Sequence, residues 1–131
     1  MKMGDCKCSC GCASNTARKS VYACAGASNV GKISYDLSIK LHQLEKYKMS
    51  CAAGVGGDIC SFVDSAKGDD NMNLLIDGCP VACLKKMFDN KRIENYDHIV
   101  LTEMGVKKEG VFEYDPSHID RLVNEIEEMG L

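Results

Sequence analysis

The sequence predicts a small α/β protein, a three-layer sandwich in which a mostly parallel four-stranded sheet lies between helices. Short apolar segments alternate four times with segments whose apolar residues recur at helical spacing, which is typical of a parallel sheet with right-handed crossovers. The chain has 131 residues, of which 45% are hydrophobic and 27% charged, so it suits a single domain with one substantial core. We expect the flavodoxin-like strand order 2-1-3-4.

The predicted strands are short apolar runs bounded by turn residues, at 21–24, 48–51, 73–77 and 98–102. Residues 54–57 are predicted to be a loop, because three of the four are glycine. Each predicted helix carries apolar residues on one face, and the last begins at Pro116. These faces comprise Ile33, Leu37, Leu41 and Leu44; Ile59, Phe62, Val63 and Ala66; Val81, Leu84, Met87 and Phe88; and Ile119, Leu122, Val123, Ile126 and Met129.

Residues 1–19 are predicted to be a flexible Cys-rich tail that precedes the α/β domain at 20–131, because they have no apolar periodicity. In an extended tail the four alternating thiols would point to one side and could gather soft metal ions. An ordinary disordered terminus is the alternative. The thiols belong to Cys6, Cys8, Cys10 and Cys12.

Composition limits the cellular compartment and the classes of binding partner that we expect. The net charge of −3 argues against binding to nucleic acid or to an anionic membrane. The sequence shows no secretory signal and no apolar run of membrane-spanning length, so we expect a cytoplasmic protein. In that reducing compartment, nine cysteines indicate metal or redox chemistry more often than disulfides.

The most informative segment is 76–83, where a predicted strand ends and a helix begins. Pro80 suits the first helical position, which makes Cys79 the predicted N-cap. Cys83 would then lie one turn further on the same side. The positive end of a helix favours thiolates, which either bind a metal or attack an electrophile.

Cysteines also follow the first two predicted strands. Because the carboxyl ends of parallel strands meet at one edge, four thiols should converge there, and zinc is the usual ion for such a set. The alternative is that each cysteine is a small core residue, which is our interpretation of Cys60. The predicted ligands are Cys24, Cys51, Cys79 and Cys83.

The segment 26–32 nearly matches the phosphate-binding motif G-x4-G-K. Ile33 stands where that motif needs a magnesium-binding Ser or Thr, which disfavours nucleotide hydrolysis. A Cys-dependent phosphatase is disfavoured too, since no arginine lies near this loop. The backbone amides could still hold a small anion beside the cysteines. The residues of this predicted anion loop are Gly26, Ser28, Asn29 and Gly31.

Three motifs in order resemble the DGC domain family of proposed zinc-binding proteins. They are Cys24–Gly31, Cys51–Gly57 and Ile76–Cys83, and the last includes Asp77-Gly78-Cys79, the motif for which the family is named. The resemblance covers roughly residues 20–130 and implies chelation by the same four cysteines. It implies no particular activity, and it does not extend to the tail.

Two classes of function remain at this point. In the first, a closed four-thiolate zinc site holds the loops together and supports folding. In the second, a labile thiolate performs redox, nucleophilic or metalloid chemistry beside the anion loop. A closed zinc site leaves no open coordination position for hydrolysis, which favours the first class. The sequence identifies neither a substrate nor a protein partner.

Overall fold

The computed structural model describes residues 18–131, where strands alternate with helices. The strands are β1 (Arg18–Ala23), β2 (Lys48–Met49), β3 (Asn71–Asp77) and β4 (Tyr96–Val100). The helices are α1 (Asn29–Gln43), α2 (Ala52–Gly56), α3 (Cys60–Lys67), α4 (Cys83–Asn90), the 3-10 helix η1 (Leu101–Met104) and α5 (Ser117–Glu128). The predictions for Cys6, Cys8, Cys10 and Cys12 fall outside the described residues.

The four strands form one sheet in the order β2-β1-β3-β4, and every pair is parallel. The predicted order is therefore confirmed. β1 and β3 are the central strands, with Val21 opposite Leu74 and Ala23 opposite Ile76. The last five residues of β3 are all buried, as expected for a central strand covered on both faces.

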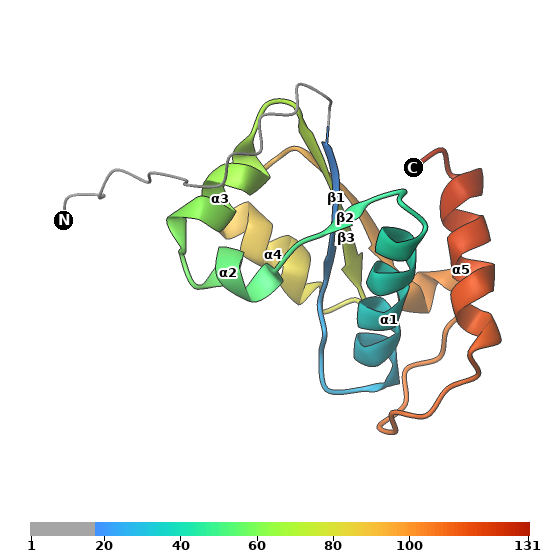
Figure 1. The fold of residues 1–131 in the computed structure, drawn as a ribbon. Helices are drawn as coiled ribbons and strands as arrows, with labels where there is room; N and C mark the ends of the chain where they lie inside the picture. Colours follow the sequence, from blue (N-terminus) through green and yellow to red (C-terminus); the bar gives the residue numbers. More distant parts are fainter. Residues whose placement is uncertain (1–17) are drawn as a thin grey trace.

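Helices cover both faces of the sheet, which confirms the three-layer prediction. Helices α1 and α5 lie on one side, and α2, α3 and α4 lie on the other (Figure 1). Neighbouring residues of a strand point to opposite faces, so Val21 enters the α1/α5 core and Tyr22 the α2/α4 core. The first core also contains Ile33, Leu37 and Leu122, and the second Leu75, Leu84 and Phe88.

The glycine-rich segment after β2 is a helix and not the predicted loop. Its glycines are sites of close packing: a Cβ on Gly54 would lie 2.6 Å from the Phe62 ring, and one on Gly56 would lie 2.9 Å from Met87 Cε. Val55 of this helix, α2, is fully buried. Local glycine content therefore indicated a loop, whereas packing between helices determines the structure.

Several positions differ from the predicted pattern. Cys60 begins α3 and is exposed, whereas the sequence pattern placed it in the core. Val81 is 53% exposed because it precedes α4 and does not belong to it. The fourth strand ends at Val100, and the residues after it turn into η1. β1 begins at Arg18, two residues before the predicted domain boundary.

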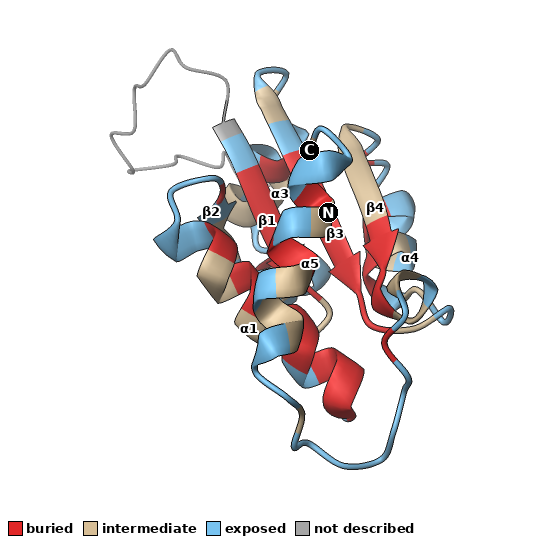
Figure 2. Ribbon diagram, turned by 90° about the vertical axis from the view of Figure 1, so that its right-hand side faces the viewer, coloured by how far each residue is buried: buried red, intermediate tan, exposed pale blue. Residues whose placement is uncertain are grey.

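A long irregular segment joins η1 to α5. All of residues 107–113 are exposed, and Figure 2 shows this connection as a pale blue loop that extends away from the sheet. We call residues 105–116 the strap.

None of the helices in residues 18–131 is long and apolar enough to cross a membrane.

Gly31→Ala should destabilise the fold by about 1–3 kcal/mol. A Cβ at Gly31 would lie 2.1 Å from the carbonyl oxygen of Gly26, so the loop before α1 would have to move. Urea unfolding followed by circular dichroism measures the change. Gly110→Ala is the matched control, since a Cβ there meets nothing within 4 Å. Equal stability of the two variants would contradict the close approach of the loop to α1.

Candidate metal and thiol centre

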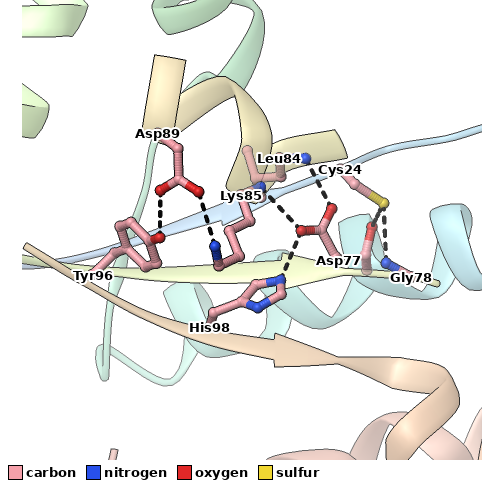
Figure 3. Close-up of polar contacts among 9 residues, drawn as sticks. Cys24, Asp77, Gly78, Leu84, Lys85, Asp89, Tyr96 and His98 are labelled. Atoms are coloured by element: carbon pink, nitrogen blue, oxygen red, sulfur yellow. Dashed lines mark hydrogen bonds and ion pairs between the residues drawn. The ribbon is translucent and has the colours of Figure 1, made fainter. Parts of the chain in front are cut away.

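Asp77, the last residue of β3, holds the start of α4 in place. Its side chain is 1% exposed; Oδ1 accepts a hydrogen bond from Leu84 N at 3.0 Å, and Oδ2 accepts one from Lys85 N at 3.1 Å. His98 Nε2 of β4 lies 2.8 Å from the same Oδ2 (Figure 3). A carboxylate that caps two free amides at a helix start is favoured by hydrogen bonding and by the helix dipole.

The residue that caps α4 is not the one that the sequence predicts. The sequence predicts Cys79 as the N-cap, with Pro80 in the first turn, but α4 begins at Cys83. Residues 78–82 form turns, and Ala82 adopts the left-handed conformation with φ 53°. The reason is that the Asp77 side chain itself caps the amides of Leu84 and Lys85. The chain between Asp77 and α4 therefore makes an extra turn before the helix begins.

Gly78 brings this loop against the start of α1. A Cβ there would lie 2.8 Å from Val30 Cγ2 and 2.9 Å from the Val30 carbonyl carbon, so only glycine fits without displacement. The Gly78 amide donates a hydrogen bond to Cys24 Sγ at 3.3 Å, drawn in Figure 3. The loop after β3 and the cysteine after β1 are therefore in direct contact.

The Cys24 sulfur also contacts Ser34 of α1, at 3.4 Å from Oγ. Ser34 is fully buried; its hydroxyl donates to Gly31 O at 2.6 Å and accepts from Ala25 N at 3.2 Å. Because the hydroxyl has only one hydrogen, a protonated Cys24 must be the donor in the contact between the two. If Cys24 loses its proton, the Ser34 hydroxyl can turn from Gly31 to the sulfur.

The Cys79 sulfur faces the strap. Lys108 Nζ lies 3.6 Å from it, within the range of a hydrogen bond to sulfur. Asn29 fixes this part of the strap: its side chain donates to Lys107 O at 2.8 Å and accepts from Glu109 N at 2.7 Å. The positive charge near Cys79 is therefore held by a specific clamp at the start of α1.

Cys51 and Cys83 are exposed, whereas Cys24 and Cys79 are half-buried, and all four are free thiols. Cys51 precedes α2, and charge on it acts on the buried phenol of Tyr22. Burial raises the pKa of Tyr22 above its ordinary value; the Ser50 side chain opposes this shift and Cys51 adds to it. Ser50 N donates to Val21 O at 2.9 Å, so the segment that carries Cys51 continues alongside β1.

The structure places the four cysteines at one edge of the sheet, each after a strand or at the start of α4. Across residues 18–131, however, no three Cys, His, Asp or Glu side chains are already grouped in a way that could hold a metal. Assignment of the zinc ligands therefore stays a prediction.

Comparison with known proteins establishes the family. The model of the DGC domain matches residues 20–126, most of the chain. The chain belongs to the DGC domain family. It is also 36% identical over 109 residues to the anaerobic and virulence modulator AnvM of Pseudomonas aeruginosa, which covers 83% of this chain and 82% of AnvM. No solved structure matches it significantly.

Each residue of the Asp-Gly-Cys motif in this DGC domain has a distinct structural task. Asp77 caps α4, Gly78 permits the contact with α1, and Cys79 presents a sulfur to Lys108. The motif therefore connects β3 to three neighbouring segments. Sequence reasoning did not predict the capping role of Asp77, because capping across a loop leaves no local signal.

The predicted anion loop of this DGC domain uses most of its polar groups internally. The Ser28 hydroxyl accepts from Gly31 N, and Asn29 N donates to Glu109 O. A Cβ on Gly31 would overlap Gly26, so these two glycines are in contact. Lys32 forms an ion pair with Asp36 at 2.8 Å. Anion binding here stays a prediction, and the observed contacts serve the clamp and the helix cap.

Sequence reasoning missed four side chains of this edge, of which His98 contacts Asp77 and the others lie near thiols. Three of them had no visible signal: His98 and Lys108 are remote in sequence from the groups that they contact, and Tyr22 resembles any apolar strand residue. The fourth, Ser34, follows the Gly loop closely but resembles any buried helix serine. The four are Tyr22, Ser34, His98 and Lys108.

Asp77→Asn should lower the free energy of unfolding by about 1–3 kcal/mol, because the amide group cannot accept from both helix amides and from His98. Denaturant unfolding measures the loss, and hydrogen exchange should accelerate first at Leu84 and Lys85. Asp69→Asn is the control, since Asp69 is exposed in a turn. The capping role is wrong if exchange at these two amides does not change.

Proposed function

We propose that this protein binds one zinc ion with cysteine thiolates at the carboxyl edge of its sheet, and that the site has a regulatory or structural role. The ligands would be Cys24, Cys51, Cys79 and Cys83. The observation that carries the proposal is that four free thiols from three separate βα connections lie at this one edge. Thiolates are preferred ligands of zinc, so the donor chemistry fits.

Assembly of the site would require local movement, because three ligands are not already grouped within residues 18–131. The exposed Cys51 and Cys83 have the most freedom to move. Structural zinc sites bind with about 10–16 kcal/mol of apparent free energy, which can offset such ordering. Bound zinc would hold the thiols as thiolates and tie the three connections together.

The two half-buried sulfurs already have hydrogen-bond donors beside them. Gly78 N already donates to Cys24, and the Ser34 hydroxyl can turn toward it after the thiol proton leaves. Lys108 donates to Cys79. Such donors stabilise negative charge on sulfur. They would therefore stabilise these two sulfurs as metal ligands.

The name of the Pseudomonas relative supports a modulating role over an enzymatic one. AnvM is described as an anaerobic and virulence modulator. Thiolate sites respond to oxidants, since oxidised sulfur no longer binds zinc. A zinc–thiolate site in the present chain would therefore suit a regulator whose state depends on oxygen or oxidants.

A second candidate function rests on the Cys79–Lys108 contact. A lysine ammonium beside a sulfur is typical of a reactive thiolate, so Cys79 could act as a nucleophile in redox or metalloid chemistry. In that case Cys79 would react with electrophiles whether or not zinc is present. The two candidates therefore differ in whether zinc protects this thiol.

The full chain with Cys6, Cys8, Cys10 and Cys12 changed to Ser should bind about one zinc, measured by elemental analysis after chelator competition. In that background, Cys83→Ser should weaken zinc binding at least about tenfold, because a ligand is lost. Val81→Ala is the control, since it alters the same loop without removing a thiol. A background protein that binds no zinc, or equal affinity of both variants, would overturn the proposed site.

Alkylation with iodoacetamide should label Cys79 in the metal-free protein, and zinc should suppress the labelling. Lys108→Ala should slow labelling of the metal-free protein, on the order of several-fold, because the sulfur loses its positive neighbour. Peptide mapping by mass spectrometry follows each thiol. Lys86→Ala, an exposed lysine of α4, serves as the control. Rapid labelling of Cys79 despite bound zinc would favour the second candidate.

A further inference from the structure

The contact between Cys79 and Lys108 joins two segments that are remote in sequence. Cys79 is a free, half-buried thiol in the loop after β3, and Lys108 lies in the strap, with Nζ 3.6 Å from the Cys79 sulfur. This separation is close to the distance of about 3–3.5 Å at which two groups held side by side can react. The amine is therefore placed to form a bond with this sulfur once the sulfur becomes electrophilic.

Lys108 is held in this place from both sides. The Asn29 side chain donates to Lys107 O at 2.8 Å and accepts from Glu109 N at 2.7 Å, and Asn29 N donates to Glu109 O at 3.2 Å. These hydrogen bonds fix the backbone of the two residues that flank Lys108. Within residues 18–131 the Lys108 ammonium forms no ion pair with a carboxylate, so no acidic side chain there draws it away from Cys79.

Pro80 limits which nitrogen can react with an oxidised Cys79. Hydrogen peroxide converts a thiol to a sulfenic acid, whose electrophilic sulfur condenses with another thiol or with a nitrogen to give a sulfenamide. The nitrogen is commonly the backbone amide of the next residue, which closes a small ring. Residue 80 is proline and has no N–H, so this ring cannot form at Cys79. The Lys108 amine is the nitrogen that the structure places in contact with the sulfur instead.

We propose that Cys79 and Lys108 form a covalent sulfenamide cross-link when the metal-free protein meets hydrogen peroxide. The Cys79 sulfur first attacks one peroxide oxygen: an S–O bond forms, the O–O bond breaks, and the thiol proton leaves with the other oxygen as water. Lys108, after losing a proton to solvent, then gives its electron pair to the sulfur. An S–N bond forms, the S–O bond breaks, and the hydroxyl leaves with an amine proton as a second water. Sulfur is oxidised by two electrons, and one peroxide is reduced.

The cross-link would be a reversible modification. It would tie the strap to the loop between β3 and α4 and would withdraw Cys79 from metal binding. A small thiol reverses it: the thiol attacks the Cys79 sulfur, Lys108 leaves as the amine, and a second thiol reduces the resulting disulfide. The inference goes beyond the proposed function, because it requires no bound zinc.

The experiment uses the full chain with the four tail cysteines changed to Ser, so that their thiols cannot capture the sulfenic acid. The metal-free protein is treated with hydrogen peroxide, digested without reductant and mapped by mass spectrometry. We expect joined peptides that contain Cys79 and Lys108, lighter than the sum of the two peptides by two hydrogen atoms. Dithiothreitol should restore both unmodified peptides.

Three variants test the geometry. Lys108→Arg keeps the positive charge but removes the amine, so the joined peptides should disappear while Cys79 is still oxidised. Lys107→Arg is the matched control and should leave their yield unchanged, because it is the Lys108 amine that lies at the sulfur. Asn29→Ala should lower the yield severalfold, because the strap loses the clamp on both sides of Lys108.

The absence of joined peptides from the background protein, whether or not Cys79 is oxidised, would overturn the inference. Joined peptides that persist in Lys108→Arg would overturn it as well. So would a disulfide between Cys79 and Cys83 as the main product, because the thiol would then capture the sulfenic acid before the amine does.

Zinc binding by the same background protein is measured separately, which distinguishes this inference from the proposed function. Cross-linking in a protein that binds no zinc would overturn only the proposed function. Zinc binding by a protein whose metal-free form does not cross-link would overturn only this inference.

Discussion

The buried carboxylate of Asp77 is the interaction on which the rest of this edge depends. This side chain is 1% exposed, and its burial is offset by hydrogen bonds with two helix amides and with His98. Through these bonds β3, α4 and β4 are held in one arrangement. The path of residues 78–82 follows, since this loop must leave the strand and return to a helix whose start is already fixed.

From this loop, contacts extend to the segment that carries Cys24 and to the strap. Gly78 reaches Cys24 and the start of α1, and Asn29 of α1 in turn clamps the strap that carries Lys108. Two residues beside the cysteines, Ala25 and Ala82, adopt left-handed conformations that are unfavourable for alanine. Such strain is often found at functional sites. It also shows that these loops are shaped by tertiary contacts and not by local preference.

The sulfurs differ in their surroundings, and this difference bears on function. The two half-buried cysteines each accept a hydrogen bond from a nitrogen donor, whereas Cys51, just before α2, and Cys83, at the start of α4, are exposed. In the proposed site, the exposed pair would have to approach the half-buried pair. Binding there would couple three βα connections, and its free energy would stabilise this edge of the sheet.

The sequence by itself determined the α/β class and the parallel order 2-1-3-4, and it placed Cys24, Cys51, Cys79 and Cys83 after the carboxyl ends of strands. These follow from apolar periodicity and from the rule that parallel strands end at a common edge. Only the tertiary structure decided that Asp77 caps α4, that Gly54 and Gly56 belong to a helix, and that Lys108 faces Cys79. The physical reason is that these contacts join residues distant in the chain, where local patterns carry no information about the partner.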